Sequence, residues 1–444
     1  MYDSGREPNG PLLEKPVNRE MQRKTAPAAA LILATLSWNA CQDTPAPSHS
    51  EITAVVDSAG VRILTNLPGS IEAAESWSLT AAPVVNIGSG ASPDVPLHRV
   101  TTVVPLDRAR VAVGMNSPTQ VQIFEGDGTL VATLGREGEG PGEFSEVQSV
   151  VPLEPDSFAV WDPSRRRMSV FTEEGQFVRE VDLSTIALIS AMAAPNTSRP
   201  SGWSYLLLST PGSVILFGVG FIGPGLGVRR VEVPSYRIST VGEELASFGP
   251  FPGEETFMSD DGFFAPYPFA ANTYCAASGE DLVVGTAEAA EVSYYGPNGT
   301  LKRIVRWPDH DRTVGGPLLS EWSDWLEAQL AAMPEEERAP RLFVLDQMPQ
   351  AEYFPAFGGL VADHTGGIWV GAYPGQIGLL GLSPEVPRVP ARRWLVFDGD
   401  GVLVANVHTP EGFKPHAVRD GHVWGIFEDE LGVESVRAYE VVRG

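Results

Sequence analysis

A recurring hairpin pattern constrains the fold more than any other feature of this sequence. In each copy, a strand of alternating apolar residues ends in an aromatic side chain. In the four clearest copies, a turn that contains Gly, Asp or Asn follows, and a second apolar strand leaves the turn. Such alternation around turn residues is typical of antiparallel strands. The aromatic positions of the six copies are Phe124, Phe171, Tyr236, Tyr295, Phe397 and Tyr439.

The spacing of these copies predicts the architecture. They follow one another at 47, 65, 59, 102 and 42 residues. A four-stranded propeller blade takes about 40–50 residues. A further strand pair precedes most of the hairpins, as residues 100–106 and 110–113 precede the first. We therefore expect an all-β fold, a six-bladed β-propeller over residues 51–444.

The last copy is incomplete, because Tyr439 lies five residues from the end of the chain. Residues 84–88 have the pattern of a spare outer strand. We expect them to pair with the last blade and close the ring of blades, which removes an exposed sheet edge. The hairpin at residues 55–64 is expected on the same blade.

The long gap of 102 residues contains a different periodicity. Apolar residues recur there at helical spacing, and Pro334 follows the last of them. This pattern predicts one short helical insertion in blade five, at about residues 317–340, that packs on the body of the fold. The periodic residues are Leu319, Trp322, Leu326, Leu330 and Met333.

Residues 1–40 are predicted to lie outside the fold. Met21 is followed by Arg23, Lys24 and an apolar run at residues 28–38. A basic start followed by such a run is typical of a secretory signal peptide. The run is shorter than the about 20 residues that a spanning helix needs. We expect translation to start at Met21, which makes residues 1–20 an upstream extension.

The end of this signal, Ala40-Cys41, resembles the signal of bacterial lipoproteins. The resemblance implies that Cys41 becomes the lipidated first residue of the mature chain. The alternative is ordinary cleavage nearby, which would leave a secreted or periplasmic protein. Residues 41–50 then form a Pro/Ser-rich tether. Both alternatives export the chain to the bacterial cell envelope or beyond, with the membrane contacted only through the lipid.

A resemblance to a known repeat family supports the propeller prediction. Residues 135–144, Gly-Arg-Glu-Gly-Glu-Gly-Pro-Gly-Glu-Phe, are similar to the loop between blades in NHL-repeat proteins. Residues 158–171 continue that repeat. The resemblance implies a six-bladed propeller, often on an envelope-bound bacterial protein. Members of the family include binding scaffolds as well as lyases and lactonases, so the fold does not determine the function.

Several kinds of chemistry are excluded or disfavoured. The net charge of −25 disfavours binding to nucleic acid. The Gly-rich residues 135–142 lack the Gly-Lys-Ser/Thr ending of a phosphate loop, and we expect a blade connector. No nucleophile elbow and no zinc-protease helix occurs. The acidic turns at residues 125–128 and 398–401 are expected to be hairpin turns rather than calcium loops. No catalytic residue is predicted.

Two of the seven histidines suggest a metal site. His98 and His416 precede the expected inner strands of blades one and six, and Glu146 enters blade two. Neighbouring blades could bring the three to one mouth of the central channel. Imidazoles with a carboxylate suit zinc, with one position open for water, and calcium is the other candidate metal. The alternative is that these side chains are solvated, and no cofactor is bound.

An aromatic segment between blades three and four suggests a second site. It is predicted to be a loop that either plugs the channel or exposes an apolar patch to a ligand or partner. Its candidate residues are Phe248, Phe251, Phe257, Phe263, Phe264 and Tyr267.

The leading functional hypothesis is an exported, lipid-anchored propeller that acts as a non-catalytic binding or scaffold module. Its partner would be an envelope protein or a small ligand. The alternative is a metal-dependent hydrolase or lyase with its site at the channel mouth. A third alternative is a sugar bound in the channel against aromatic faces.

Overall fold

The computed structural model describes residues 52–88, 96–106, 110–153, 156–186, 203–220, 225–375 and 389–444. The predicted signal peptide, Cys41 and the tether lie outside the described residues. Among the residues that the structure describes, no helix is long and apolar enough to cross a membrane.

The described strands form six sheets of four to six strands, which we number from first to sixth along the chain. The first sheet contains β6 (Val100–Pro105), β7 (Arg110–Asn116), β8 (Thr119–Glu125) and β9 (Leu130–Leu134). The second contains β10 (Ser149–Leu153), β11 (Ser157–Asp162), β12 (Arg167–Thr172) and β13 (Phe177–Asp182). The third contains β14 (Trp203–Thr210), β15 (Ser213–Gly220), β16 (Gly227–Ser239), β17 (Glu244–Met258) and β18 (Phe264–Pro266).

The other three sheets also recruit strands from the N-terminal segment. The fourth contains β19 (Tyr274–Ser278), β20 (Asp281–Gly285), β21 (Glu291–Tyr295) and β22 (Leu301–Arg306), with β2 (Val61–Asn66) and β1 (Thr53–Ser58) added. The fifth contains β23 (Gly359–Ala362), β24 (Ile368–Gly371), β25 (Arg392–Phe397) and β26 (Leu403–Thr409), with β3 (Glu75–Ser76) added. The sixth contains β27 (Phe413–Arg419), β28 (His422–Glu428) and β29 (Glu434–Val442), with β4 (Ser78–Leu79) and β5 (Val85–Ile87) added.

The six sheets are arranged in a cycle. We call the first strand of each sheet its inner strand; these are β6, β10, β14, β19, β23 and β27. Each inner strand contacts the next, and β27 contacts β6 again. The hydrophobic cores follow the same order, with one core between each pair of neighbouring sheets, including the sixth and the first. Sheets of this size, packed face to face in order, fit the blades of a propeller.

The aromatic residue of each predicted hairpin lies on the third strand of its sheet, as the spacing predicted. In four sheets the ladder to the fourth strand shifts its register at this residue, for example between Ile123 and Phe124. The turn that follows holds a glycine with φ between 81° and 94° in each of the first five sheets, a conformation that favours glycine. These residues are Gly128, Gly175, Gly242, Gly299 and Gly401.

The turn glycines also bring neighbouring sheets together. A Cβ at Gly175, in the second sheet, would lie 2.7 Å from Leu134 of the first. A Cβ at Gly242, in the third sheet, would lie 2.8 Å from Val181 of the second. Gly128 of the first sheet faces Ile87, which lies on β5. The strand β5 therefore occupies the place of an outer strand in the sixth sheet.

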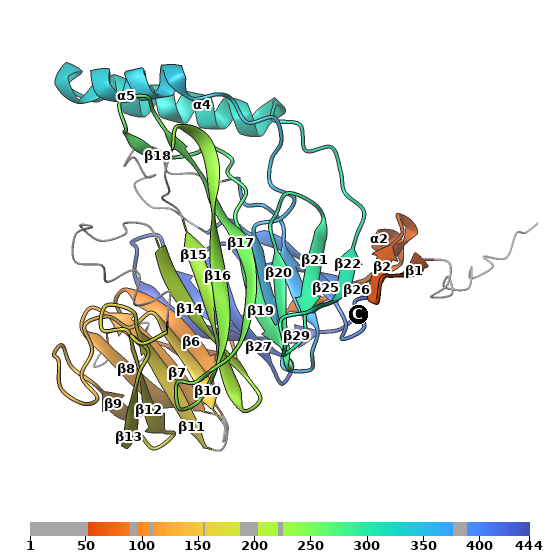
Figure 1. The fold of residues 1–444 in the computed structure, drawn as a ribbon. Helices are drawn as coiled ribbons and strands as arrows, with labels where there is room; N and C mark the ends of the chain where they lie inside the picture. The colour runs from red at the N-terminus through yellow and green to blue at the C-terminus, as the bar shows by residue number, and fades with distance from the viewer. Residues whose placement is uncertain are drawn as a thin grey trace, which may run out of the picture. The chain divides into compact units, whose positions relative to one another are not determined.

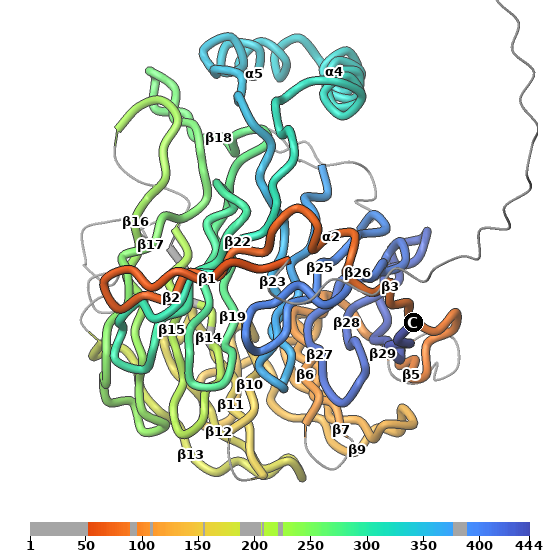
Figure 2. Tube along the Cα trace, turned by 90° about the vertical axis from the view of Figure 1, so that its right-hand side faces the viewer, coloured from red at the N-terminus to blue at the C-terminus, as the bar shows by residue number. Residues whose placement is uncertain are grey.

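The predicted pairing of the two ends of the fold is confirmed, because β5 pairs antiparallel with β29. The predicted place of the hairpin at residues 55–64 is wrong. It forms β1 and β2, and β2 pairs parallel with β22 of the fourth sheet rather than with the sixth. Figure 2 shows this N-terminal segment beside β22 and, after α2 (Gly69–Ala73), beside β26. The N-terminal segment thus pairs with the outer strands of the fourth and fifth sheets, β22 and β26.

One buried side chain holds this N-terminal segment to two sheets. Asn66 is 1% exposed. Its amide donates to the carbonyl oxygens of Arg306 in the fourth sheet and Gly401 in the fifth, each at 3.0 Å. Its Oδ1 accepts from the amide of Leu403 at 2.8 Å. Because these backbone groups are shielded from water, the bonds favour this one placement of the segment.

The helical insertion contains two helices, not one. The segment between β22 and β23 forms α4 (Gly316–Ala331) and α5 (Glu335–Gln347). Pro334 ends the first helix, as predicted, but it also precedes the second. Three glutamates occupy the first turn of α5, where acidic side chains are stabilised by the helix dipole. Both helices lie beside β18 and pack on its aromatic neighbours (Figure 1).

The two turn and connector predictions agree with the structure. Residues 135–142 connect β9 to β10, and the Arg167 guanidinium donates to the carbonyl oxygens of Glu139 and Gly140 there. Asp398 accepts from the amides of Asp400 and Val402 within its own turn. These bonds are those of an acidic hairpin turn.

Candidate functional site

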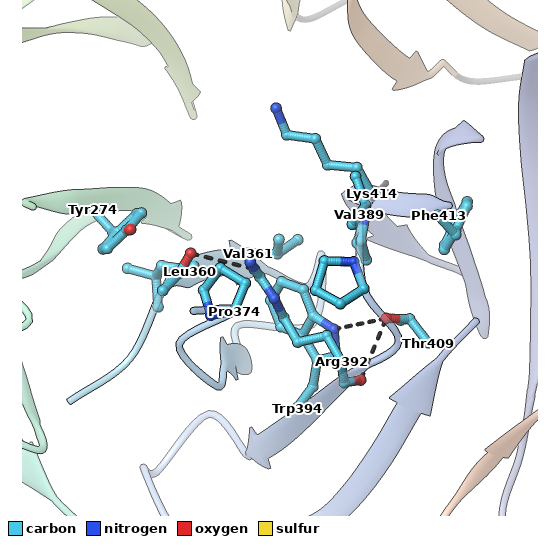
Figure 3. A pocket seen from close by; sticks show the side chains of 14 residues that line it. Tyr274, Leu360, Val361, Pro374, Val389, Arg392, Trp394, Thr409, Phe413 and Lys414 are labelled. Atoms are coloured by element: carbon cyan, nitrogen blue, oxygen red, sulfur yellow. Dashed lines mark hydrogen bonds between the residues drawn. The ribbon is translucent and has the colours of Figure 1, made fainter. Parts of the chain in front are cut away.

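A cavity of about 540 Å³ lies between the fifth and sixth sheets, where three inner strands begin (Figure 3). Its wall combines apolar and aromatic side chains with two cationic ones. The starts of β19, β23 and β27 supply Tyr274, Gly359 and Phe413, respectively, and the lining includes Leu360, Trp394 and Lys414. A cavity of this size with a few convergent polar groups is typical of small-molecule sites, which measure about 300–1,000 Å³.

Glycines in the fifth sheet make room for the large side chains of the wall. A Cβ at Gly359 would lie 2.9 Å from Nη1 of Arg392 and 3.2 Å from the Trp394 ring. A Cβ at Gly371 would meet the same two side chains at 2.9 and 3.1 Å. Any larger residue at these positions would displace Arg392 and Trp394. The glycines therefore place both side chains against the cavity.

Arg392 lies at the centre of the lining (Figure 3). Its Nη1 donates to the carbonyl oxygen of Gly358 at 3.2 Å, and its guanidinium carbon lies 5.5 Å from the centre of the Trp394 ring. Its Nε is buried without a hydrogen-bond partner in the described part of the chain. Burial lowers the pKa of Arg392, and Tyr274 opposes this effect. The guanidinium keeps its charge at any physiological pH.

Lys414 supplies the second cation of the cavity. Burial among the surrounding strands lowers the pKa of its ammonium, and the charge of Arg392 lowers it further. The residue is exposed to solvent while protein surrounds it on several sides. Within the described ranges, no carboxylate forms an ion pair with Lys414. The two cations therefore line one cavity, and neither forms an ion pair with a carboxylate among the described residues.

Tyr274 lines the cavity, and Tyr373 and Glu254 lie near Tyr274 but outside the lining. Burial raises the pKa of Tyr274, with Arg392 opposing the effect and Glu254 adding to it. Burial also raises the pKa of Tyr373, and Tyr274 adds to that shift. The pKa of Glu254 is raised by burial as well, against the opposing charge of Arg230. Because its pKa is raised, Tyr274 keeps a neutral hydroxyl group at physiological pH, and this group can offer a hydrogen bond to a ligand in the cavity.

His416 follows Lys414 on the same inner strand, at an irregularity in the ladder between Pro415 and Ala417. The residue is half-buried, but its Nε2 is fully buried and makes no hydrogen bond with described residues. Burial, and then the Lys414 charge, lowers the pKa of His416 to about 3. The imidazole is therefore neutral at physiological pH.

The structure does not bring the three predicted metal ligands together as a metal-binding group. The inner strands β6 and β27 are in contact, as the prediction for His98 and His416 required. However, His98 is exposed, and Glu146 accepts a hydrogen bond from Ser164 at 2.9 Å. In the part of the chain that the structure describes, no three His, Cys, Asp or Glu side chains are placed to hold a metal ion.

The predicted aromatic loop is not a loop. Phe248, Phe251 and Phe257 lie on β17, and Phe264 lies on β18. Phe248 and Phe251 fill the core between the third and fourth sheets, whereas Phe257 and Tyr267 pack against α4 and α5. Only Phe263 of this set is exposed, at 44%. These strands were not predicted because four prolines interrupt the segment, and proline is uncommon within strands. In the structure, the ladder between β16 and β17 shifts its register at several points.

Sequence comparisons give no family, and similar solved structures are distant. No family model matches the chain, and no curated protein matches it. A member of the DUF4221 family from Bacteroides vulgatus is similar at 9% identity and a TM-score of 0.48, over 83% of this chain and 99% of that chain. Virginiamycin B lyase from Staphylococcus aureus is similar at 10% identity and a TM-score of 0.38, over 78% and 98%.

A calcium-binding protein, regucalcin from Agrobacterium tumefaciens, is similar at 8% identity and a TM-score of 0.37, over 83% of this chain and 97% of that chain. Such low values carry no argument about the ligand or reaction of this chain. The fold described above rests on the strand pairing of the chain itself.

The cavity residues were missed in the sequence. Arg392 and Trp394 lie on the third strand of one sheet, and Lys414 lies on the first strand of the next. Their meeting depends on how neighbouring sheets pack, which no local pattern reveals. One signal was present: the chain has only four lysines, and Lys414 lies two residues before His416, which was predicted to lie near the channel mouth.

The buried imidazole of His416 predicts a pH effect on stability. Its pKa of about 3 lies below the ordinary value of 6.5. Between these values the unfolded chain binds a proton that the folded chain does not. The free energy of unfolding should therefore fall as pH falls from 6.5, by at most about 1.4 kcal/mol per pH unit from this group. Denaturant unfolding of wild type and His416→Gln at pH 7.5, 6 and 5 measures the effect.

The variant should lose this contribution, and NMR should show a wild-type His416 ring that stays neutral at pH 5. His408→Gln, at an exposed position on β26, should keep the wild-type dependence. A His416 ring that becomes protonated above pH 6 would contradict the buried, unpartnered geometry.

Proposed function

We propose that this chain is a closed six-bladed β-propeller that acts as a non-catalytic binding module, with a small-molecule site in the cavity between the fifth and sixth sheets. The observation that carries the proposal is the cavity itself, with its aromatic wall and convergent polar groups. Trp394 and Thr409 are fixed by a hydrogen bond of 3.2 Å, and Thr409 in turn donates to the Arg392 carbonyl. A wall held in this way is preformed for a ligand.

The metal-dependent hydrolase or lyase is the weaker candidate. The structure does not bring the residues proposed for it together among the described side chains, and the lining of the cavity contains no nucleophile paired with a base. A scaffold role for the aromatic segment is also weaker, because five of its six rings are buried or half-buried. The sugar alternative would use the same aromatic wall as the proposed cavity site.

Narrowing the cavity should weaken ligand binding. N-phenyl-1-naphthylamine, a neutral fluorescent probe, is expected to bind the wild type with one site per chain. Val389 lines the cavity, so Val389→Trp should lower its affinity by about ten-fold or more, because the indole takes up part of the space. Fluorescence titration measures this change.

Val241→Trp is the matched control, since Val241 is 62% exposed in a turn of the third sheet. It should bind the probe as the wild type does. Unchanged binding by Val389→Trp would show that the probe sits elsewhere and would count against the cavity as the ligand site.

We also propose that the chain is exported and anchored to the bacterial cell envelope by a lipid on Cys41. The motif at residues 40–41 and the apolar run before it support this proposal. The Pro/Ser-rich residues after Cys41 would give the propeller a flexible tether. Such an anchor would hold a binding module at a membrane surface without a spanning helix.

Replacing the anchoring residue should release the protein. In cells that express the full chain, Cys41→Ser should move most of it from the membrane fraction to the soluble fraction. Cys275→Ser is the control, because Cys275 lies on β19 within the fold. Cell fractionation and immunoblotting measure the distribution. A Cys41→Ser protein that stays in the membrane fraction would contradict the lipid anchor.

A further inference from the structure

We propose that the cavity between the fifth and sixth sheets binds an organic anion: a carboxylate held by Arg392 and Lys414, carried on a flat apolar body. This inference deepens the proposed function and rests on it, since it names the class of ligand for the same cavity.

The first argument is the lack of a counter-charge. In the described part of the chain, Lys414 makes no ion pair, and the Arg392 guanidinium donates only to the neutral carbonyl oxygen of Gly358. The Nε of Arg392 is buried without a hydrogen-bond partner among the described residues. Arg392 is half-buried, and a guanidinium shielded from water without an anionic partner is costly; a charge-assisted bond to a bound carboxylate would offset that cost.

The second argument is the mutual repulsion of the two cations. Both side chains line the same cavity, and the charge of Arg392 lowers the pKa of Lys414 in addition to the larger effect of burial. An anion placed between them would interact favourably with both. This positive site stands out in a chain whose net charge is −25, because acidic residues elsewhere on the chain far outnumber basic ones.

The third argument concerns the body of the ligand. The remaining wall is apolar or aromatic and includes Leu360, Val361, Pro374, Trp394 and Phe413. Figure 3 shows these side chains around Arg392. Flat apolar groups bind well against such walls, where they bury area and can lie against aromatic rings. Inorganic anions would leave most of this wall unused.

Paired probes that differ only in charge test the inference. 2-Naphthoate carries a carboxylate at neutral pH, and 2-naphthamide is its neutral counterpart. Isothermal titration calorimetry at pH 7.5 and low salt should give at least about ten-fold tighter binding for the naphthoate. Lys414→Gln should remove most of this preference while changing the affinity for naphthamide by less than about two-fold.

Lys302→Gln is the matched control, because Lys302 is a surface lysine paired with Asp281 at 2.9 Å. It should keep the wild-type preference. Arg392→Gln provides a second test of the same site, and Arg393→Gln, at the adjacent exposed position, is its control. Circular dichroism and thermal unfolding would confirm that each variant is folded.

The outcomes separate the inference from the proposed function. Equal affinity for the two probes, with both weakened by Val389→Trp, would overturn the anion site and leave the cavity as a binding site. A preference for naphthoate that survives both Lys414→Gln and Arg392→Gln would also overturn the assigned residues. Binding of neither probe to the wild type would overturn the inference and count against the cavity function as well.

Discussion

The pairing of β5 with β29 is the interaction on which the rest of the described structure depends. It joins residues near the start of the fold to its last strand and supplies the sixth sheet with an outer strand. The hydrophobic core between the sixth and first sheets then contains Ile87 from β5, beside Val103 and Val436. Without this strand, the sixth sheet would present a free edge, and Gly128 of the first sheet would lose its neighbour. Closure of the cycle also fixes how the fifth and sixth sheets meet, and therefore the cavity between them.

The N-terminal segment extends this closure across three sheets. It adds β2 to the fourth sheet, β3 to the fifth, and β4 and β5 to the sixth. Asn66 connects it to two of them through buried hydrogen bonds. Because the segment covers the outer edges of these sheets, another chain cannot pair with the covered strands. The sheets that form the cavity wall are thus held from outside as well as at the centre.

Much of this fold could be predicted from the sequence, but the site could not. Each sheet has an aromatic residue on its third strand, and the first five sheets have a turn glycine after it, so Phe124, Gly128 and their counterparts reveal the sheets directly. The hairpin at residues 55–64 was misplaced because parallel pairing to β22 leaves no mark in a local pattern. The aromatic strands β17 and β18 were hidden by their prolines. Arg392 and Lys414 come from different sheets, and only packing between sheets brings them to one cavity.

The cavity combines features that have separate roles. Glycines in the fifth sheet create space, aromatic residues line it, and two cations without a carboxylate partner in the described chain give it a positive charge. The most direct test of this account is a crystal structure of the protein soaked with 2-naphthoate. The account predicts the carboxylate within about 4 Å of both Lys414 and Arg392, with the rings against Trp394. Naphthoate bound only elsewhere, or a cavity filled by the protein's own side chains, would contradict it.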